Sequence, residues 1–261
     1  MRSIFRCALV PEICTPTALP LAPVGRIEHI LLMIKTPLQP VPEPDAFETW
    51  IFDLDNTLYP SDSNLLGEVV GRMTEYVAEH LGIDHERACE VRHALFTTYG
   101  TTLRGLMTEH GVDPGGFLEY VHDIDFSAVA ADEPLARALD RLPGRKVVFT
   151  NASLDYAEKV IERIGLAGHF DGVFDVIAAG YVPKPAPETY RKMLAHFEID
   201  PTSAVMFEDI AKNLVPASAL GMTTVWVPTS NDWAREHTEN GHIDYTVENL
   251  TDWLFALAGM V

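Results

Sequence analysis

The chain of 261 residues carries 38 Asp and Glu against 19 Lys and Arg, for a formal net charge of −19. Long-range repulsion disfavours nucleic-acid polymers and anionic membrane surfaces as partners, whereas a small phosphorylated metabolite bound beside a metal ion is compatible with this charge. No apolar run reaches the length of a membrane span, and the three cysteines offer no even disulfide framework, so we predict a soluble, cytoplasmic protein whose oligomeric state the sequence does not indicate.

The first segment, residues 1–46, holds eight of the 18 prolines and has no sustained hydrophobic periodicity. Its prolines interrupt the apolar stretch that a signal peptide would need, which argues against export. We therefore predict a disordered, proline-rich extension, with Met33 as a candidate start of the native protein.

From residue 47 the pattern becomes regular, with short β-rich runs separated by helical periodicity. Buried strands that alternate with helices are typical of an α/β fold with a parallel sheet. Gly165 and Gly221 are suitable helix terminators. The predicted strands are 49–53, 146–150, 174–179, 204–208 and 223–227, and the predicted helices between them are 154–166, 187–198 and 210–220.

The connection between the first two strands is far longer than a βαβ crossover needs, which indicates an insertion at 62–131. Apolar residues recur there at three- and four-residue spacing after a candidate helix cap at Ser63. Further helical segments at 85–98, 101–110 and 114–122 complete a small bundle. We therefore expect a helical cap subdomain at 62–131 and a core made of 47–61 and 132–261.

Polar residues lie at or after the ends of four predicted strands. Asp53 ends the first strand, Thr150 and Asn151 end the second, and Lys184 lies in the loop after the 174–179 strand. The acid pair Glu208 and Asp209 ends the 204–208 strand. Each feature alone is typical of a turn or a helix cap. Because the carboxyl ends of parallel strands meet at one edge of a sheet, their joint occurrence predicts a common pocket.

The residue types in this pocket fit phosphoryl transfer to a carboxylate. Asp53 is the candidate nucleophile, and Asp55 can protonate the leaving oxygen and later take a proton from the hydrolytic water. Lys184 would screen the negative charge, while the Thr150 hydroxyl and the Asn151 amide would bind phosphate oxygens.

The same acids predict a Mg²⁺ site. This hard cation prefers oxygen ligands and keeps several sites for water and phosphate oxygens. Asp53, the main-chain carbonyl of Asp55 and Asp209 would be sufficient protein ligands.

Four segments, "DLDNTLYP", "FTNA", "PKPAPE" and "FEDIAKN", resemble the successive signatures of the haloacid dehalogenase superfamily of phosphohydrolases. The resemblance covers about 48–228. It implies a Rossmann-like core, a helical cap inserted after the first strand, Mg²⁺ and an aspartyl-phosphate intermediate. The implied roles are nucleophile for Asp53, acid and base for Asp55, phosphate-binding hydroxyl for Thr150, motif lysine for Lys184, metal acid for Asp209, and positions behind the metal ligands for Glu208 and Asn213.

Two further segments, "LYPSDSNL" and "YGTTLRGLM", resemble the pyrimidine 5′-nucleotidase group, which dephosphorylates nucleoside monophosphates such as UMP and CMP. The family's last motif usually reads Asp-Asp-Ser, where this chain has Glu208, Asp209 and Ile210. The second segment holds four candidates for substrate contacts, although it also fits a simple helix junction with a threonine cap. These candidates are Tyr99, Thr101, Thr102 and Arg104.

Other functions stay open to different degrees. A dehalogenase needs neither Asp55 nor Asp209, and a phosphonatase needs a cap lysine, which no position between Tyr59 and Arg145 offers. A phosphatase of another small metabolite or a sugar phosphomutase would use the same carboxylates. A module that only binds a phosphorylated metabolite is the alternative outside enzymes.

Overall fold

The structure is a computed structural model that describes residues 42–259. Most of the predicted extension 1–46, together with the candidate start at Met33, lies outside these residues. Within the described part of the chain, no helix is long and apolar enough to cross a membrane.

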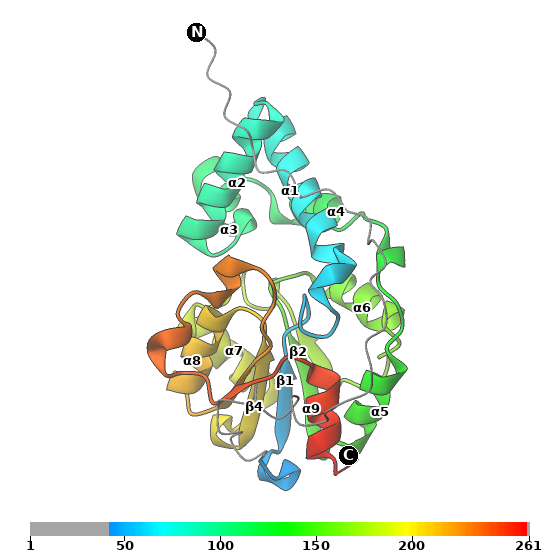
Figure 1. The fold of residues 1–261 in the computed structure, drawn as a ribbon. Helices are drawn as coiled ribbons and strands as arrows, with labels where there is room; N and C mark the ends of the chain where they lie inside the picture. The colour runs from blue at the N-terminus through cyan, green and yellow to red at the C-terminus, as the bar shows by residue number, and fades with distance from the viewer. Residues whose placement is uncertain (1–41, 260–261) are drawn as a thin grey trace, which may run out of the picture. The chain divides into compact units, whose positions relative to one another are not determined.

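The core is one sheet of six parallel strands in the order β3-β2-β1-β4-β5-β6 (Figure 1). A parallel sheet needs a crossover between neighbouring strands, which the alternating helices supply. A Rossmann-like α/β fold is therefore confirmed. The strands are β1 (Thr49–Phe52), β2 (Arg145–Phe149), β3 (Gly172–Phe174), β4 (Ala204–Glu208), β5 (Thr223–Trp226) and β6 (Tyr245–Thr246).

Strand β1 lies between β2 and β4, and all four of its residues are buried. Its side chains alternate between two apolar clusters, with Trp50 and Phe52 in one and Ile51 in the other. Full burial of one such side chain contributes about 1.5–3 kcal/mol to stability. The continuous apolar run "TWIF" is thus what a central strand covered on both faces requires.

Helices cover both faces of the sheet. Helices α7 and α8 contribute to the cluster that contains Ile51, whereas α5, α6 and α9 contribute to the cluster that contains Trp50, in agreement with Figure 1. The predicted helices 154–166 and 187–198 are observed with slightly earlier ends, while α5 and α9 were not predicted. These helices are α5 (Glu133–Arg141), α6 (Leu154–Arg163), α7 (Pro187–Phe197), α8 (Leu214–Ala219) and α9 (Leu250–Leu257).

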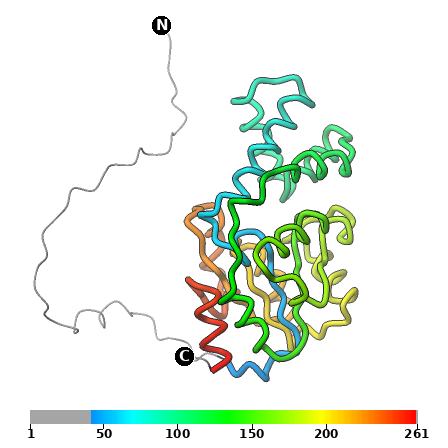
Figure 2. The backbone as a smooth tube through the Cα atoms, turned by 90° about the vertical axis from the view of Figure 1, so that its right-hand side faces the viewer, coloured from blue at the N-terminus to red at the C-terminus, as the bar shows by residue number. Residues whose placement is uncertain are grey.

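Four helices lie between β1 and α5, and Figure 2 shows them gathered beyond one end of the strands. We call them the cap helices: α1 (Leu65–Leu81), α2 (His85–Tyr99), α3 (Thr102–His110) and α4 (Pro114–Val121). Side chains cap three of them, because Asp84, Thr101 and Asp113 each accept a hydrogen bond from a main-chain N–H of the first turn. The predicted cap at Ser63 lies one residue too early, although the Ser63 hydroxyl accepts a hydrogen bond from the Leu65 N–H at 3.5 Å. The residue before α1 is Asn64, in the left-handed conformation with φ 59°.

Two predicted elements differ from the structure. The strand predicted at 174–179 ends at Phe174, because the next residue, Asp175, turns the chain. Its carboxylate accepts hydrogen bonds from the main-chain N–H groups of Leu154 and Ala178, at 2.9 and 2.8 Å. The helix predicted at 210–220 begins as a 3₁₀ turn, Ala211–Asn213, and becomes α-helical only at α8.

Candidate active site

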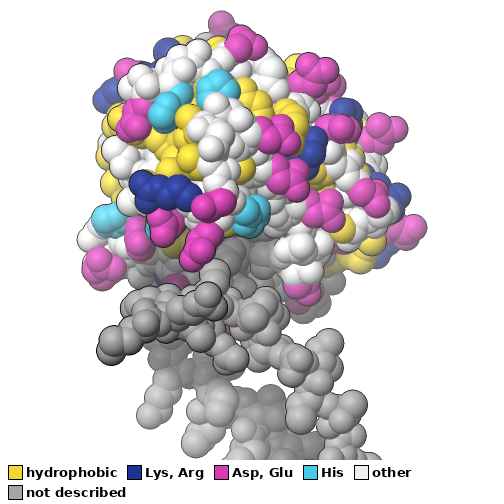
Figure 3. All heavy atoms as spheres, turned by 90° about the horizontal axis from the view of Figure 1, so that it is seen from above, with side chains coloured by type: hydrophobic (Ala, Val, Ile, Leu, Met, Phe, Trp, Pro, Cys, Tyr) yellow, Lys and Arg dark blue, Asp and Glu magenta, His cyan; other side chains and the backbone are white. Residues whose placement is uncertain are grey.

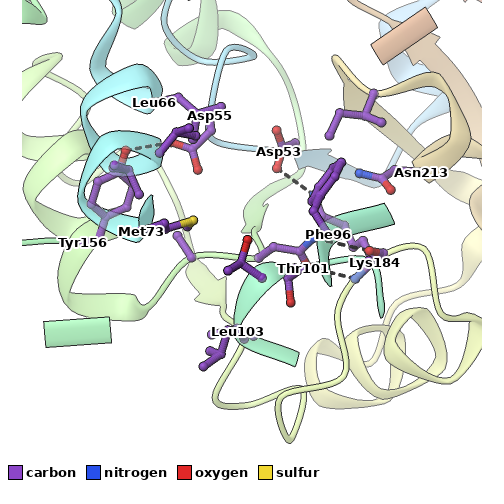
Figure 4. A pocket seen from close by; sticks show the side chains of 18 of the residues that line it. Asp53, Asp55, Leu66, Met73, Phe96, Thr101, Leu103, Tyr156, Lys184 and Asn213 are labelled. Atoms are coloured by element: carbon purple, nitrogen blue, oxygen red, sulfur yellow. Dashed lines mark hydrogen bonds and ion pairs between the residues drawn. The ribbon is translucent and has the colours of Figure 1, made fainter. Parts of the chain in front are cut away.

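The predicted polar residues converge where β1, β2 and β4 end. Asp53 follows β1, Asn151 follows the end of β2, and Glu208 is the last residue of β4. A cavity of about 400 Å³ lies between this sheet edge and the cap helices, and its lining includes Asp53, Asp55 and Asp209 (Figure 4). The topology thus brings together acids that are about 150 residues apart in sequence.

Lys184 is the centre of this cluster. Its ammonium donates hydrogen bonds to Asp53 Oδ1 at 2.6 Å, to Glu208 Oε2 at 2.7 Å and to the Phe149 carbonyl at 2.8 Å. Burial alone would lower the pKa of Lys184, but the charges of Asp53 and Glu208 outweigh it and raise that pKa. The lysine is therefore a permanent cation with all three of its N–H donors in use.

The two polar residues after β2, predicted to bind phosphate oxygens, bond to the protein's own backbone instead. The side-chain oxygen of Asn151, Oδ1, accepts a hydrogen bond from the Lys184 main-chain N–H at 2.8 Å. The side-chain nitrogen, Nδ2, lies 3.4 Å from the Lys184 main-chain carbonyl. Asn151 lines the cavity but holds the lysine loop in place. The Thr150 hydroxyl accepts from the Ala152 N–H at 3.0 Å, closing a turn, and Thr150 is not part of the cavity wall.

Three buried carboxylates fit a hard divalent cation. Oxygens of Asp53, Glu208 and Asp209 lie within 4.8 Å of one another. Asp209 Oδ2 and Asn213 Oδ1 are buried without a hydrogen-bond donor among the described residues, and both residues line the cavity. Unpartnered buried oxygens are costly unless a cation or water meets them. Glu208 and Asn213, predicted to lie behind the metal ligands, thus present oxygens at the site itself.

Burial, together with repulsion between neighbouring carboxylates, disfavours ionisation of Asp53 and Asp209. Burial, followed by the charge of Glu208, raises the pKa of Asp53 to about 7, although Lys184 acts in the opposite direction. Burial and the charges of Glu208 and Asp53 also raise the pKa of Asp209. A further positive charge in the cluster would favour the ionised carboxylates.

Asp55 is oriented by two tyrosines that sequence reasoning missed. The Tyr59 hydroxyl donates to Asp55 Oδ1 at 2.5 Å and the Tyr156 hydroxyl donates to the same oxygen at 2.8 Å. Burial raises the pKa of Asp55, and these two hydrogen bonds lower it. Tyr59 belongs to the same segment as Asp55, "DLDNTLYP". Its position four residues after Asp55 could have indicated the contact. Tyr156 comes from α6, and no local pattern connects it with Asp55.

The comparisons with known proteins agree with this geometry. A model of the haloacid dehalogenase-like hydrolases matches residues 47–221. The chain belongs to this hydrolase family. Among solved structures, the haloacid dehalogenase family phosphatase of Thermococcus onnurineus shares its fold, with a TM-score of 0.56 and 18% identity, over 82% of this chain and 98% of that one. CbbY of Rhodobacter sphaeroides, solved in complex with phosphate, also has a TM-score of 0.56. It is 20% identical, and the match covers 79% of this chain and 96% of CbbY.

Two curated relatives match parts of this hydrolase. Phosphate metabolism protein 8 of Saccharomyces cerevisiae is 25% identical over 201 residues, which cover 70% of this chain and 62% of the yeast protein. Fructose-1-phosphate phosphatase YqaB of Escherichia coli is 33% identical over 96 residues, which cover 35% of this chain and 50% of that protein. The matches thus span less than two thirds of each relative's length.

On the cap side, the residues that line the hydrolase's cavity differ in part from the predicted substrate contacts. Thr101 and Thr102 line the cavity, but Tyr99 and Arg104 do not. The Tyr99 hydroxyl donates to Glu109 at 2.9 Å, which connects α2 with α3. The Thr101 hydroxyl caps α3 by accepting from the Arg104 N–H. The residues that form much of the wall instead are Leu66, Val69, Met73, Arg92, Phe96, Leu103, Phe117, Lys212 and Trp233.

His122, just after α4, joins the cap to the core of the hydrolase. Its ring stacks on Tyr156 with the centroids 4.4 Å apart, and its Nδ1 lies 2.9 Å from Ser153 Oγ. Burial, with a smaller effect from Lys159, lowers the pKa of His122 to about 4. His122 is therefore neutral at pH 7 and packs against the tyrosine that orients Asp55.

Proposed function

We propose that this hydrolase is a Mg²⁺-dependent phosphomonoesterase that works through an aspartyl-phosphate on Asp53. The observation that carries the proposal is the buried ammonium of Lys184, which contacts both Asp53 and Glu208. Asp55 and Asp209 line the same cavity, as do Arg92 and Lys212, but Lys184 is the only one of these cations within 4.0 Å of a described carboxylate. A dianionic phosphate can bind beside these carboxylates only if further positive charge is present, which favours a divalent cation.

The first half of the proposed reaction transfers the phosphoryl group to the protein. A carboxylate oxygen of Asp53 attacks phosphorus, the bond from phosphorus to the leaving oxygen breaks, and Asp55 gives that oxygen a proton. In the second half, water attacks the phosphorus while Asp55 takes its proton. The bond between phosphorus and Asp53 then breaks, which restores the carboxylate and releases phosphate.

Lys184 serves both halves by stabilising negative charge on Asp53 and on the phosphoryl oxygens. Because its position is fixed before substrate binds, little reorganisation is needed during the reaction. Asp53 and Asp209, with the Asp55 main-chain carbonyl, are the groups that we propose hold Mg²⁺. When bound, the ion would supply positive charge to the phosphoryl oxygens and favour the ionised form of Asp53.

The substrate that we propose is a nucleoside 5′-monophosphate such as UMP or CMP. The two segments that resemble pyrimidine 5′-nucleotidases support this choice. A cavity of about 400 Å³ has a volume typical of sites for small molecules. Phe96 and Trp233, packed edge to face with ring centroids 5.6 Å apart, give it an aromatic wall that suits a planar base.

Phosphate release from UMP by the purified protein tests this proposal. We expect turnover with Mg²⁺, none in excess chelator, recovery when Mg²⁺ is added back, and little activity with Ca²⁺, which is larger and less strict in geometry. Formation of an acid-stable, alkali-labile phosphoprotein would support the intermediate. Full activity in excess chelator would contradict the metal dependence, and absence of turnover on every phosphate ester would favour a binding module.

A further inference from the structure

Apart from Lys184, two cations line the active-site cavity: Arg92 from α2 and Lys212 from the turn after β4. Within residues 42–259, neither has a carboxylate within 4.0 Å. The chain has twice as many acidic as basic residues, and Figure 3 shows acidic side chains spread over the surface of one face. Two cations without a counter-charge in a cavity of so acidic a protein indicate a ligand that supplies acceptors.

Arg92 is held so that its terminal nitrogens stay available. Its Nε donates to the Thr74 hydroxyl at 3.1 Å, and that hydroxyl donates to the Val70 carbonyl of α1 at 3.0 Å. No described residue accepts a hydrogen bond from the two terminal nitrogens of the guanidinium. The contact with α1 therefore orients the group, and the four N–H donors of the two terminal nitrogens remain for a ligand.

Lys212 reaches the same wall from the core. Its Nζ lies 4.9 Å from the ring centroid of Phe96, which follows Arg92 by one turn on α2. Lys212 thus lies over the face of Phe96, and that ring lines the cavity beside Lys184 and Asn213 (Figure 4). A ligand group that enters this part of the cavity can meet one cation from α2 and one from the core.

We propose that Arg92 and Lys212 determine substrate choice by binding hydrogen-bond acceptors on the part of the substrate that is not phosphate. In UMP these acceptors are the two carbonyls of uracil, and in CMP they are the single carbonyl and ring N3 of cytosine. Guanidinium and ammonium groups donate and cannot accept, so uracil, with two carbonyls, fits them best. Adenine has no carbonyl and offers only ring nitrogens as acceptors, so we expect it to fit these donors less well. This inference rests on the proposed phosphatase function and replaces Tyr99 and Arg104 as the candidate contacts.

The test compares UMP with ribose 5-phosphate, which keeps the sugar and phosphate but lacks the base, and with AMP. We expect the wild-type protein to favour UMP over both. Arg92→Met and Lys212→Met should each lower kcat/KM for UMP by about 10- to 100-fold, the scale of a lost hydrogen bond to a charged group, and should lower it much less for ribose 5-phosphate. The advantage of UMP over AMP should shrink in both variants.

Arg87→Met is the matched control, because this exposed arginine of α2 pairs with Glu90 and is not part of the cavity wall. It should leave all three substrates unchanged. Thermal unfolding shows whether Arg92→Met folds, and Lys212→Met tests the same subsite from the core if it does not. Equal losses on UMP and ribose 5-phosphate, no loss on UMP, or a wild-type preference for AMP would overturn the inference. Absence of hydrolysis of any ester by the wild-type protein would overturn the proposed function instead.

Discussion

Tyr156 donates its hydroxyl proton to Asp55 Oδ1 at 2.8 Å, across 101 residues of sequence. Tyr59 donates to the same oxygen, so Oδ1 already accepts two hydrogen bonds. The other oxygen, Oδ2, accepts none from the described residues and is therefore the one that can exchange a proton with substrate or water. The tyrosines thus orient Asp55 and leave Oδ2 as its free oxygen.

Tyr156→Phe should therefore slow hydrolysis of an alkyl phosphate by about tenfold, because a less well-oriented acid transfers its proton less readily. Hydrolysis of p-nitrophenyl phosphate should change less, since nitrophenolate leaves without a proton. The ratio of the two rates is the measurement. Tyr120→Phe, which removes a hydroxyl outside the cavity, should leave that ratio unchanged, and a parallel loss on both esters in Tyr156→Phe would refute the positioning role.

Asp53→Asn should reduce turnover by at least about 10³-fold, because an amide of nearly the same shape is not nucleophilic. The free energy of unfolding should stay within about 1 kcal/mol of the wild-type value, since one ion pair is lost while repulsion from Glu208 and Asp55 is relieved. Phosphate release and denaturant unfolding check the two parts. Substantial activity in the pure variant would exclude Asp53 as the nucleophile.

Lys184→Met should lower the free energy of unfolding by about 3–5 kcal/mol at pH 7.5, because it leaves Asp53 and Glu208 buried without their counter-charge. Adding Glu208→Gln should recover part of this loss, since one of the stranded charges is removed. Denaturant unfolding in the absence of divalent cations gives both values. As a control, Lys159→Met at an exposed position should change stability by less than about 0.5 kcal/mol.

His122 should make stability depend on pH. Its pKa is about 4 in the folded protein against an ordinary value of 6.5, so between these values the unfolded chain binds a proton that the folded protein does not. The wild-type protein should therefore lose stability as pH falls from 6.5 to 4, by up to about 3 kcal/mol. His122→Asn, which does not titrate, should lack this part of the pH dependence. Identical pH profiles for the two proteins would show that His122 does not contribute.

Sequence reasoning located the parts of the site that depend on local pattern. Asp53 follows β1 and Glu208 is the last residue of β4, and the topology alone places such residues at one edge of the parallel sheet. The Asn151 hydrogen bonds to Lys184 and the Tyr156 contact with Asp55 depend on how loops and helices far apart in sequence pack. No periodicity or spacing encodes those contacts, so they could be found only from the folded structure.

The substrate-facing wall was predicted least well. Tyr99 and Arg104 lie near Gly100 at a helix junction, a place where sequence alone suggests substrate contacts. In the structure, the Tyr99 hydroxyl donates to Glu109 instead. Arg92 and Lys212 instead stand within an ordinary helical repeat and a turn. The position of Arg92 on the cavity depends on how α2 packs, and that of Lys212 on how the turn after β4 folds, which local sequence does not determine.

Strand β1 lies in the middle of the sheet, so residues next to it are held more firmly than residues on the cap helices. The Asp53 main-chain N–H donates to the Phe207 carbonyl of β4 at 2.9 Å, so the backbone of Asp53 is tied to the central ladder of the sheet. Arg92 and Phe96 both belong to α2, which is not part of that ladder. A lineage of such proteins can thus acquire new substrates through changes in α1 to α3 while the reacting groups stay where they are.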